Sequence, residues 1–194
     1  NNGSPLIRQR LSFHAEYTCS RELLEGVAAL AQKYEAPVYT HNSETRAEVE
    51  QCLARTGMTP PVYMDSLGLF QYGGGGYHCT HLSAADLEIF KARGLYAVSN
   101  PGSNTKLASG IAPVSRMLEL GIPVALGTDG PASNNCLDMF REMFLVAGRQ
   151  KLETRNAAAV PADEVLKMAC VNGARAMGLD DCDSLAVGKQ ADLM

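Results

Sequence analysis

The chain has 194 residues, of which 46% are hydrophobic and 20% are charged, and its formal net charge at pH 7 is -4. This composition is typical of a soluble globular protein of one domain or slightly more. The negative charge argues against nucleic acid or an anionic membrane as the main partner. No apolar stretch approaches the roughly 18 to 20 residues that a membrane span requires. The first residues, NNGSPLIRQR, carry no signal-peptide pattern.

Six cysteines occur without any C-x-x-C or zinc-finger spacing. Several fall inside apolar helical or strand patterns, which suits buried, reduced thiols. We therefore expect a cytoplasmic protein without disulfides. The cysteines are Cys19, Cys52, Cys79, Cys136, Cys170 and Cys182.

Strand-like and helix-like segments alternate in the first half of the chain. In order, the pattern predicts a strand at 7–13, an amphipathic helix at 20–34, a strand at 37–41, helices at 44–56 and 60–67, a short strand around 73–79, and a helix at 83–94. Ser20 and Ser83 are expected N-caps, and Gly94 is the expected C-terminal stop. The glycine run at 73–76 predicts a place where backbones or a ligand approach closely. Because no Lys-Ser/Thr follows the run, it is not a phosphate-binding loop.

The alternation continues in the second half. The pattern predicts a strand at 95–99, a long polar loop at 100–110, a helix at 112–121, a strand at 123–128, and helices near 137–150 and 161–177. Repeated β-loop-α units with short apolar strands favour a parallel sheet with outer helices. Five such strands suit an open sheet or an arc of a barrel. The last residues, DSLAVGKQADLM, begin a turn and a new strand pattern and then stop, so we expect a chain cut before its fold is complete.

Two metal-competent side chains stand where strands end. His41 closes the segment APVYTH, and Asp129 follows the segment PVALGT. Catalytic groups of parallel α/β barrels occupy the carboxyl ends of strands, where the loops converge. With Glu44 three residues after the histidine, such a pair can hold a metal-bound water and move its protons. No His-x-His pair exists in the chain, so half of such a site is missing.

Six motifs, in the right order over most of the chain, resemble the amidohydrolase superfamily. Within it, the chain looks most like the aminohydrolase branch that contains 5-methylthioadenosine/S-adenosylhomocysteine deaminases and triazine chlorohydrolases. The matching segments are HAEYTCS, THNSET, YHCTHLS, SNPGSNTKLASGIAP, LGTDGPASNNCLDMFREM and DSLAVGKQADL.

The resemblance implies a distorted (β/α)8 barrel of the TIM type. Residues 1–178 would supply about its fourth to eighth strands, as a partial α/β barrel domain. Residues 179–194 would mark the return of the chain into a small β-sandwich domain.

The resemblance also implies roles for five residues. His41 and Asp129 match metal ligands of the family, and Glu44 matches its proton-shuttling glutamate. His78 matches the histidine that contacts the attacking water or substrate, and His14 matches a substrate-contacting histidine. The family's other ligands, a His-x-His pair, have no counterpart in the chain.

The implied reaction is hydrolytic deamination of a purine nucleoside such as 5-methylthioadenosine or S-adenosylhomocysteine, with a divalent metal that is most often zinc, while iron and manganese also fit the donors. Asp129 would accept a proton from water, and Glu44 would protonate a ring nitrogen. Glu16 and Ser99 depart from the family pattern, with proline and histidine common there, and both lie on the substrate side. A triazine chlorohydrolase, a guanine deaminase and a pterin deaminase therefore remain open alternatives.

A different class of interpretation is that the 194 residues alone form a catalytically incomplete fragment. Zinc sites of this kind use at least three protein ligands. Open sheet edges and an uncovered apolar interior predict a homo-oligomer or aggregation. Of the remaining polar residues, we expect His81 to hydrogen-bond locally. Several loop residues are expected to tie loops around the site mouth, namely Asn100, Asn104, Ser133 and Asn134.

Overall fold

The computed structural model describes residues 9–191. Its centre is a sheet of five parallel strands in which each strand pairs with the next one along the chain, in the order β1-β2-β3-β4-β5. An order that advances in one direction, without a reversal, is that of an arc of an α/β barrel, so the predicted fold class is confirmed. The strands are β1 (Leu11–Ser12), β2 (Val38–Asn42), β3 (Gly74–His78), β4 (Tyr96–Ser99) and β5 (Val124–Leu126).

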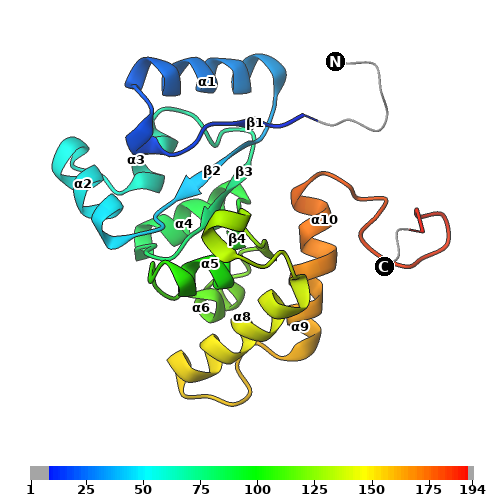
Figure 1. The fold of residues 1–194 in the computed structure, drawn as a ribbon. Coiled ribbons are helices and arrows are strands. Elements are labelled where there is room, and N and C mark those ends of the chain that lie inside the picture. The colour runs from blue at the N-terminus through cyan, green and yellow to red at the C-terminus, as the bar shows by residue number, and fades with distance from the viewer. Residues whose placement is uncertain (1–8, 192–194) are drawn as a thin grey trace.

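Helices connect the strands and flank the sheet (Figure 1). In the view of Figure 1, α1, α2 and α3 lie towards the side of β1 and β2, and α8, α9 and α10 lie on the other side, beyond β4. No helix within residues 9–191 is long and apolar enough to cross a membrane. The connecting helices are α1 (Arg21–Tyr34), α2 (Arg46–Thr56), α3 (Pro60–Ser66), α4 (Ala84–Arg93), α5 (Pro101–Lys106) and α6 (Val114–Glu119). The helices after β5 are α7 (Pro131–Asn134), α8 (Met139–Thr154), α9 (Ala162–Lys167), the π-helical turn η2 (Met168–Asn172) and α10 (Gly173–Ala176).

The expected helix ends are confirmed. The Ser20 side chain accepts a hydrogen bond from the Leu23 N–H at the start of α1. Ser83 forms a capping box with Asp86 at the start of α4, and Gly94 closes that helix in the left-handed conformation. These side chains satisfy backbone groups that a helix end leaves unpaired. Local chemistry therefore determines where these two helices begin and end.

Four expectations about elements were wrong in part. The predicted loop at 100–110 contains a helix, α5, and the predicted helix at 161–177 is interrupted by η2. Of the predicted strand at 7–13, only Leu11–Ser12 pairs within the described residues, and positions 7 and 8 lie outside them. The strand pattern expected after residue 183 forms turns and bends in residues 183–191, without a strand there, and 192–194 lie outside the described residues.

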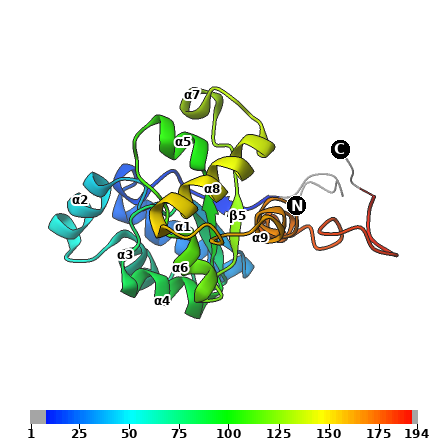
Figure 2. The ribbon, with the colours of Figure 1, turned by 90° about the horizontal axis from the view of Figure 1, so that it is seen from below.

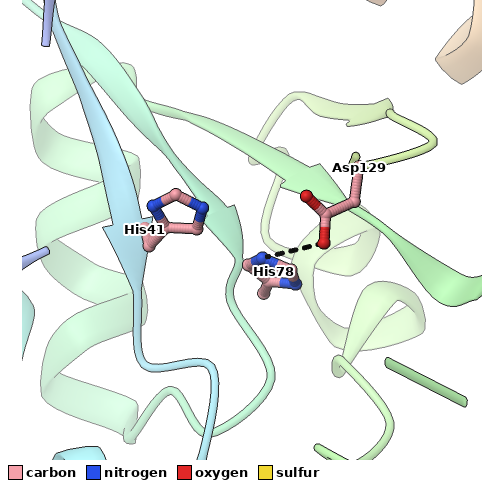
Figure 3. Close-up of side chains that lie close together, drawn as sticks. All are labelled: His41, His78 and Asp129. Atoms are coloured by element: carbon pink, nitrogen blue, oxygen red, sulfur yellow. Dashed lines mark ion pairs between the residues drawn. The ribbon is translucent and has the colours of Figure 1, made fainter. Parts of the chain in front are cut away.

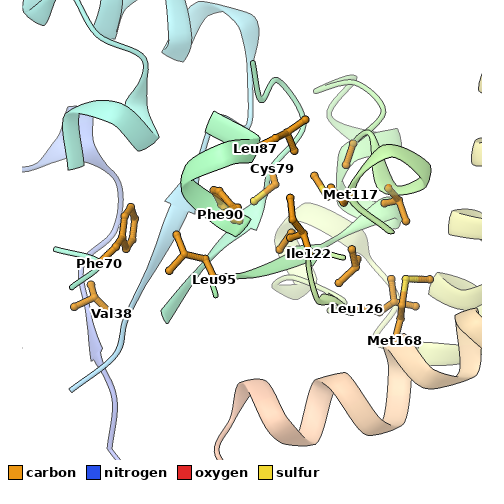
Figure 4. Close-up of a cluster of buried hydrophobic side chains, with 14 of the residues drawn as sticks. Val38, Phe70, Cys79, Leu87, Phe90, Leu95, Met117, Ile122, Leu126 and Met168 are labelled. Atoms are coloured by element: carbon orange, nitrogen blue, oxygen red, sulfur yellow. The ribbon is translucent and has the colours of Figure 1, made fainter. Parts of the chain in front are cut away.

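The hydrophobic core lies between the sheet and the surrounding helices (Figure 4). Phe90 of α4, Leu95 and Ile122 are almost completely buried in it, together with Met117 of α6. Burial of this apolar surface provides the main driving force that holds the helices on the sheet. The strands are thereby fixed, and their carboxyl ends become a rigid platform.

Candidate functional site

Three metal-competent side chains meet at the carboxyl ends of the strands (Figure 3). His41 belongs to β2, His78 is the last residue of β3, and Asp129 lies three residues after the end of β5. Each offers one possible ligand atom, and these atoms all lie within 4.8 Å of one another. The predicted convergence of His41 and Asp129 is therefore seen in the structure, and His78 joins them.

The backbone turns sharply where this cluster forms. Asn42 is the partner of His78 in the sheet register, so regular alternation would point His78 away from the face of His41. His78 instead adopts a φ of 68°, and its ring stacks on that of His41 with centroids 5.4 Å apart. Asp129 has a φ of 59°. Positive φ is uncommon outside glycine and is concentrated at functional sites.

Hydrogen bonds fix which nitrogen of each ring carries the proton. His41 Nδ1 lies 2.6 Å from the carbonyl oxygen of His14. Because a carbonyl only accepts, Nδ1–H donates and the neutral ring keeps a lone pair on Nε2. His78 Nδ1 donates in the same way to Oδ1 of the buried Asn104, at 2.8 Å. Both rings thus present Nε2 as a potential metal ligand or hydrogen-bond acceptor.

The Asp129 carboxylate is held by two donors. The Ser103 hydroxyl donates to Oδ2 at 2.7 Å, and the Gly130 N–H donates to Oδ1 at 2.7 Å. Partial burial acts to raise the pKa of the Asp129 carboxyl, but these hydrogen bonds and the nearby His78 outweigh it, so the pKa lies below its ordinary value. The carboxylate is therefore ionised at neutral pH.

Glu44 lies beside the cluster. Its Oε2 is 3.7 Å from His78 Nε2, and its Oε1 accepts a hydrogen bond from the Ser109 hydroxyl at 3.1 Å. His78 Nε2 is also 4.0 Å from Asp129 Oδ2, so this nitrogen lies between two carboxylates. The buried Glu48 carboxylate accepts the Glu44 N–H at 2.7 Å and thereby holds the backbone of that residue.

His14 completes the group. Its ring lies 4.7 Å from the ring of His41, and its Nδ1 is 3.0 Å from the Thr18 hydroxyl. That hydroxyl donates to the Ala15 carbonyl at 3.0 Å, so it accepts from His14 Nδ1, and His14 Nε2 is left as an acceptor. The side chain is exposed, as a group that contacts a ligand from outside must be.

The structure thus brings together all five residues that the sequence singles out. Sequence reasoning missed His78 as a third candidate metal donor, and it missed Ser103 and Ser109 as supports. Both serines lie in a motif that was recognised, but nothing in their spacing indicates what they contact. His81 was expected to hydrogen-bond locally, but its Nε2 instead contacts the Ser109 carbonyl at 2.7 Å, 28 residues further along the chain.

The donor set fits a divalent metal. Two neutral imidazole nitrogens and one carboxylate oxygen are ligands of catalytic zinc sites, and they also suit iron and manganese. Both imidazoles donate their other N–H to an oxygen, which is the usual support of a metal-bound histidine.

Comparison with known proteins agrees with this chemistry. The model of the amidohydrolase family matches residues 2–194. A 5-methylthioadenosine/S-adenosylhomocysteine deaminase of Syntrophobacter fumaroxidans is 47% identical over 191 residues, which cover 98% of this chain and 44% of the relative. A 5'-deoxyadenosine deaminase of Methanothermobacter thermautotrophicus is 44% identical over 188 residues, covering 97% of this chain and 44% of the relative.

A solved structure is also similar. The adenosine deaminase from Xanthomonas campestris with bound Zn superposes with a TM-score of 0.92 at 38% identity, over 98% of this chain and 44% of that one. The chain therefore spans less than half the length of these relatives. Because the family model matches nearly the whole chain and the fold agrees, the chain belongs to the amidohydrolase family.

Proposed function

We propose that this chain carries metal-binding and proton-transferring residues of an aminohydrolase that deaminates a purine nucleoside, with 5-methylthioadenosine or S-adenosylhomocysteine as the leading substrates. The observation that carries the proposal is the cluster of His41, His78 and Asp129, with Glu44 at its edge. The names of the similar relatives support the substrate class. An exocyclic amine on an electron-poor ring is displaced by water only if the water is activated and the ring is protonated.

The residues divide these tasks. His41 and Asp129 would hold a divalent metal, most often zinc in sites of this composition. A bound divalent metal supplies Lewis-acid activation of water. Asp129, whose low pKa keeps it ionised, also accepts a proton from the attacking water. Glu44 in its acid form protonates a ring nitrogen and regains a proton from the hydroxyl added to the ring carbon, while the proton taken up by Asp129 passes to the amine, which leaves as ammonia with the assistance of Glu44.

The two remaining histidines orient the reactants. His78 donates from Nδ1 to Asn104, so Nε2 of the neutral ring accepts a hydrogen bond from the attacking water and aims it at the reacting carbon. His14 Nε2 is an exposed acceptor that contacts a hydroxyl of the substrate.

The chain alone supplies fewer metal ligands than a high-affinity zinc site needs. With His78 assigned to the water, two protein ligands remain, whereas catalytic zinc sites use three or more. We infer that further donors come from residues outside this chain, in keeping with its share of its relatives' length. The isolated 194-residue chain should then bind zinc weakly and should self-associate. Metal analysis with gel filtration tests this, and a monomer with one tightly bound metal equivalent would contradict it.

The activity is tested on the complete protein. Ammonia release is measured with 5-methylthioadenosine, S-adenosylhomocysteine, 5'-deoxyadenosine and guanine, and chloride release with a chlorotriazine. We expect the adenine nucleosides to be the best substrates. Asp129→Ala should abolish turnover, because it removes a metal ligand and a base together. Normal turnover in this variant would overturn the proposed roles.

A further inference from the structure

The segment 100–110, here named the supporting loop, contacts three of the five residues of the candidate site. Three of its side chains each form a hydrogen bond with a different site residue. The pairs are Ser103 with Asp129, Asn104 with His78, and Ser109 with Glu44. Ser103 and Asn104 lie in α5, so any shift of α5 would displace the hydrogen-bond partners of Asp129 and His78 together.

Helix α8 holds one end of the supporting loop through Glu142. This side chain has no exposed surface, and its Oε2 accepts the Gly102 N–H at 2.7 Å. Its Oε1 accepts from Asn134 Nδ2 at 2.7 Å, and the same amide nitrogen donates to the Thr128 carbonyl at 2.6 Å. Glu142 therefore joins α5 to the backbone that leads into Asp129. A Cβ on Gly102 would lie 2.4 Å from Glu142 Oε1, so the contact requires glycine there.

The charge of Glu142 has no cationic partner in residues 9–191, since none of their Lys, Arg or His side chains forms an ion pair with it. A buried carboxylate without a cation is costly, and its two hydrogen bonds offset this cost only in one geometry. Such a group constrains its surroundings strongly, because any displacement leaves a buried charge unsatisfied.

About two turns further on, the same helix contacts other parts of the loop through Arg149 and the segment just after the loop through Gln150. Arg149 donates from Nη1 to the Pro101 carbonyl at 3.0 Å and also bonds the Thr105 hydroxyl and the Gly110 carbonyl. Gln150 Nε2 donates to the Ala112 carbonyl at 2.8 Å. Positions 142, 149 and 150 share one face of α8, following the helical repeat. Figure 2 shows α5 and α7 gathered beside α8.

We propose that α8 acts as a clamp on the supporting loop, and that Glu142 and Arg149 are positioning residues for His78 and Asp129. The role in turnover rests on the proposed function. The effect of the clamp can be measured without substrate, because the clamp determines how firmly Asp129 holds a metal and whether His78 keeps its proton on Nδ1.

The first test compares Glu142→Gln with Glu88→Gln, a matched change at an exposed helical position in α4. The glutamine amide must turn its NH2 group towards either Gly102 N–H or Asn134 NH2, which are both donors. We expect zinc affinity of the complete protein, measured by chelator competition, to fall about 10-fold to 100-fold. In the metal-free protein, nitrogen NMR of the neutral His78 ring should show a mixture of tautomers. The control should change neither readout.

The second test compares Arg149→Lys with Arg141→Lys. It tests the clamp independently if Glu142→Gln does not fold. A lysine has one nitrogen and cannot serve three separated acceptors. We expect Arg149→Lys to weaken zinc binding and to disturb the His78 tautomer, whereas the exposed Arg141→Lys should leave both unchanged.

Coupling gives a further check. If Glu142 acts through α5, its effect on zinc affinity should be less than additive with that of Ser103→Ala. Full additivity would overturn the clamp, and so would a Glu142→Gln protein that melts earlier but retains zinc affinity and the His78 tautomer. If the complete protein deaminates no nucleoside while these shifts appear, the proposed function fails and the clamp stands.

Discussion

The glycine strand β3 offers a test of how the site is built. Gly74 pairs with Val38 of β2 and has a φ of 126°. A Cβ there would lie 1.9 Å from the Val38 carbonyl oxygen and 2.7 Å from its nitrogen. These are backbone atoms, so no side-chain rotation relieves the contact. Gly74→Ala must therefore separate β2 from β3, the two strands that bring His41 next to His78.

The magnitude follows from two contributions. A φ of 126° lies far from the left-handed well near +57° that L-residues tolerate, so strain of about 1 to 3 kcal/mol is expected. Separating the strands also leaves buried backbone groups unpaired, at about 1 to 3 kcal/mol for each group. Together they predict a loss of roughly 4 kcal/mol in the free energy of unfolding, an exceptional value for one methyl group.

Gly94→Ala is the matched control. Gly94 has a φ of 61°, and no heavy atom of the described residues lies within 4 Å of its added Cβ beyond its own neighbourhood. Only conformational strain of about 1 kcal/mol remains. Denaturant titration of both variants measures the difference, provided that the slope with denaturant is unchanged. Equal losses in the two variants would refute the view that close backbone packing, rather than backbone conformation alone, requires glycine in β3.

Other predictions follow from burial and charge. Phe90 is fully buried, so Phe90→Ala should cost about 3 to 5 kcal/mol in the same titration, and a loss below 1 kcal/mol would show that the core is packed differently. Burial raises the pKa of the Cys79 thiol well above its ordinary value, whereas Cys170 is exposed. Iodoacetamide should therefore label Cys170 and spare Cys79 in the native protein, as checked by peptide mass spectrometry. Hydrogen bonds from Lys189 and then Arg175 lower the pKa of Asp183 to about 2. Its stabilising contribution is thus complete above about pH 4 and is lost as the pH falls towards 2. The melting temperatures of Asp183→Asn and the parent should then converge in acid, and a constant difference would contradict the ion pairs.

Most of the fold is predictable because local sequence patterns determine its helices and strands. Alternating apolar runs and helical spacing identify the five strands, and capping residues such as Ser20 and Ser83 mark the helix starts. One exception is α5, a helix of six residues. A helix this short is not stable by itself, so it depends on tertiary contacts such as those of Glu142 and Arg149. The break at η2 has a similar origin, since Asn172 Nδ2 donates to the Val124 carbonyl across a long sequence separation.

The candidate site is predictable in its members but not in its arrangement. Residue types at strand ends, together with the family resemblance, select His14, His41, Glu44, His78 and Asp129. What they do not provide is the direction of each side chain. Ser103 and Asn104 owe their roles to a helix that local patterns do not show.

Residues with positive φ explain why the sequence pattern does not predict how the side chains of the site are arranged. Ser43, His78 and Cys79 all have positive φ where β2 and β3 end. Their turns support one another, since the Cys79 N–H donates to the Asn42 carbonyl and the Thr80 N–H donates to the Ser43 carbonyl, both at 3.1 Å. These mutual hydrogen bonds help to offset the conformational energy that positive φ costs at each turn. The direction of His78 is thus a property of two strand ends that lie far apart in the sequence. A local reading of either end predicts a regular strand, with this ring on the wrong face.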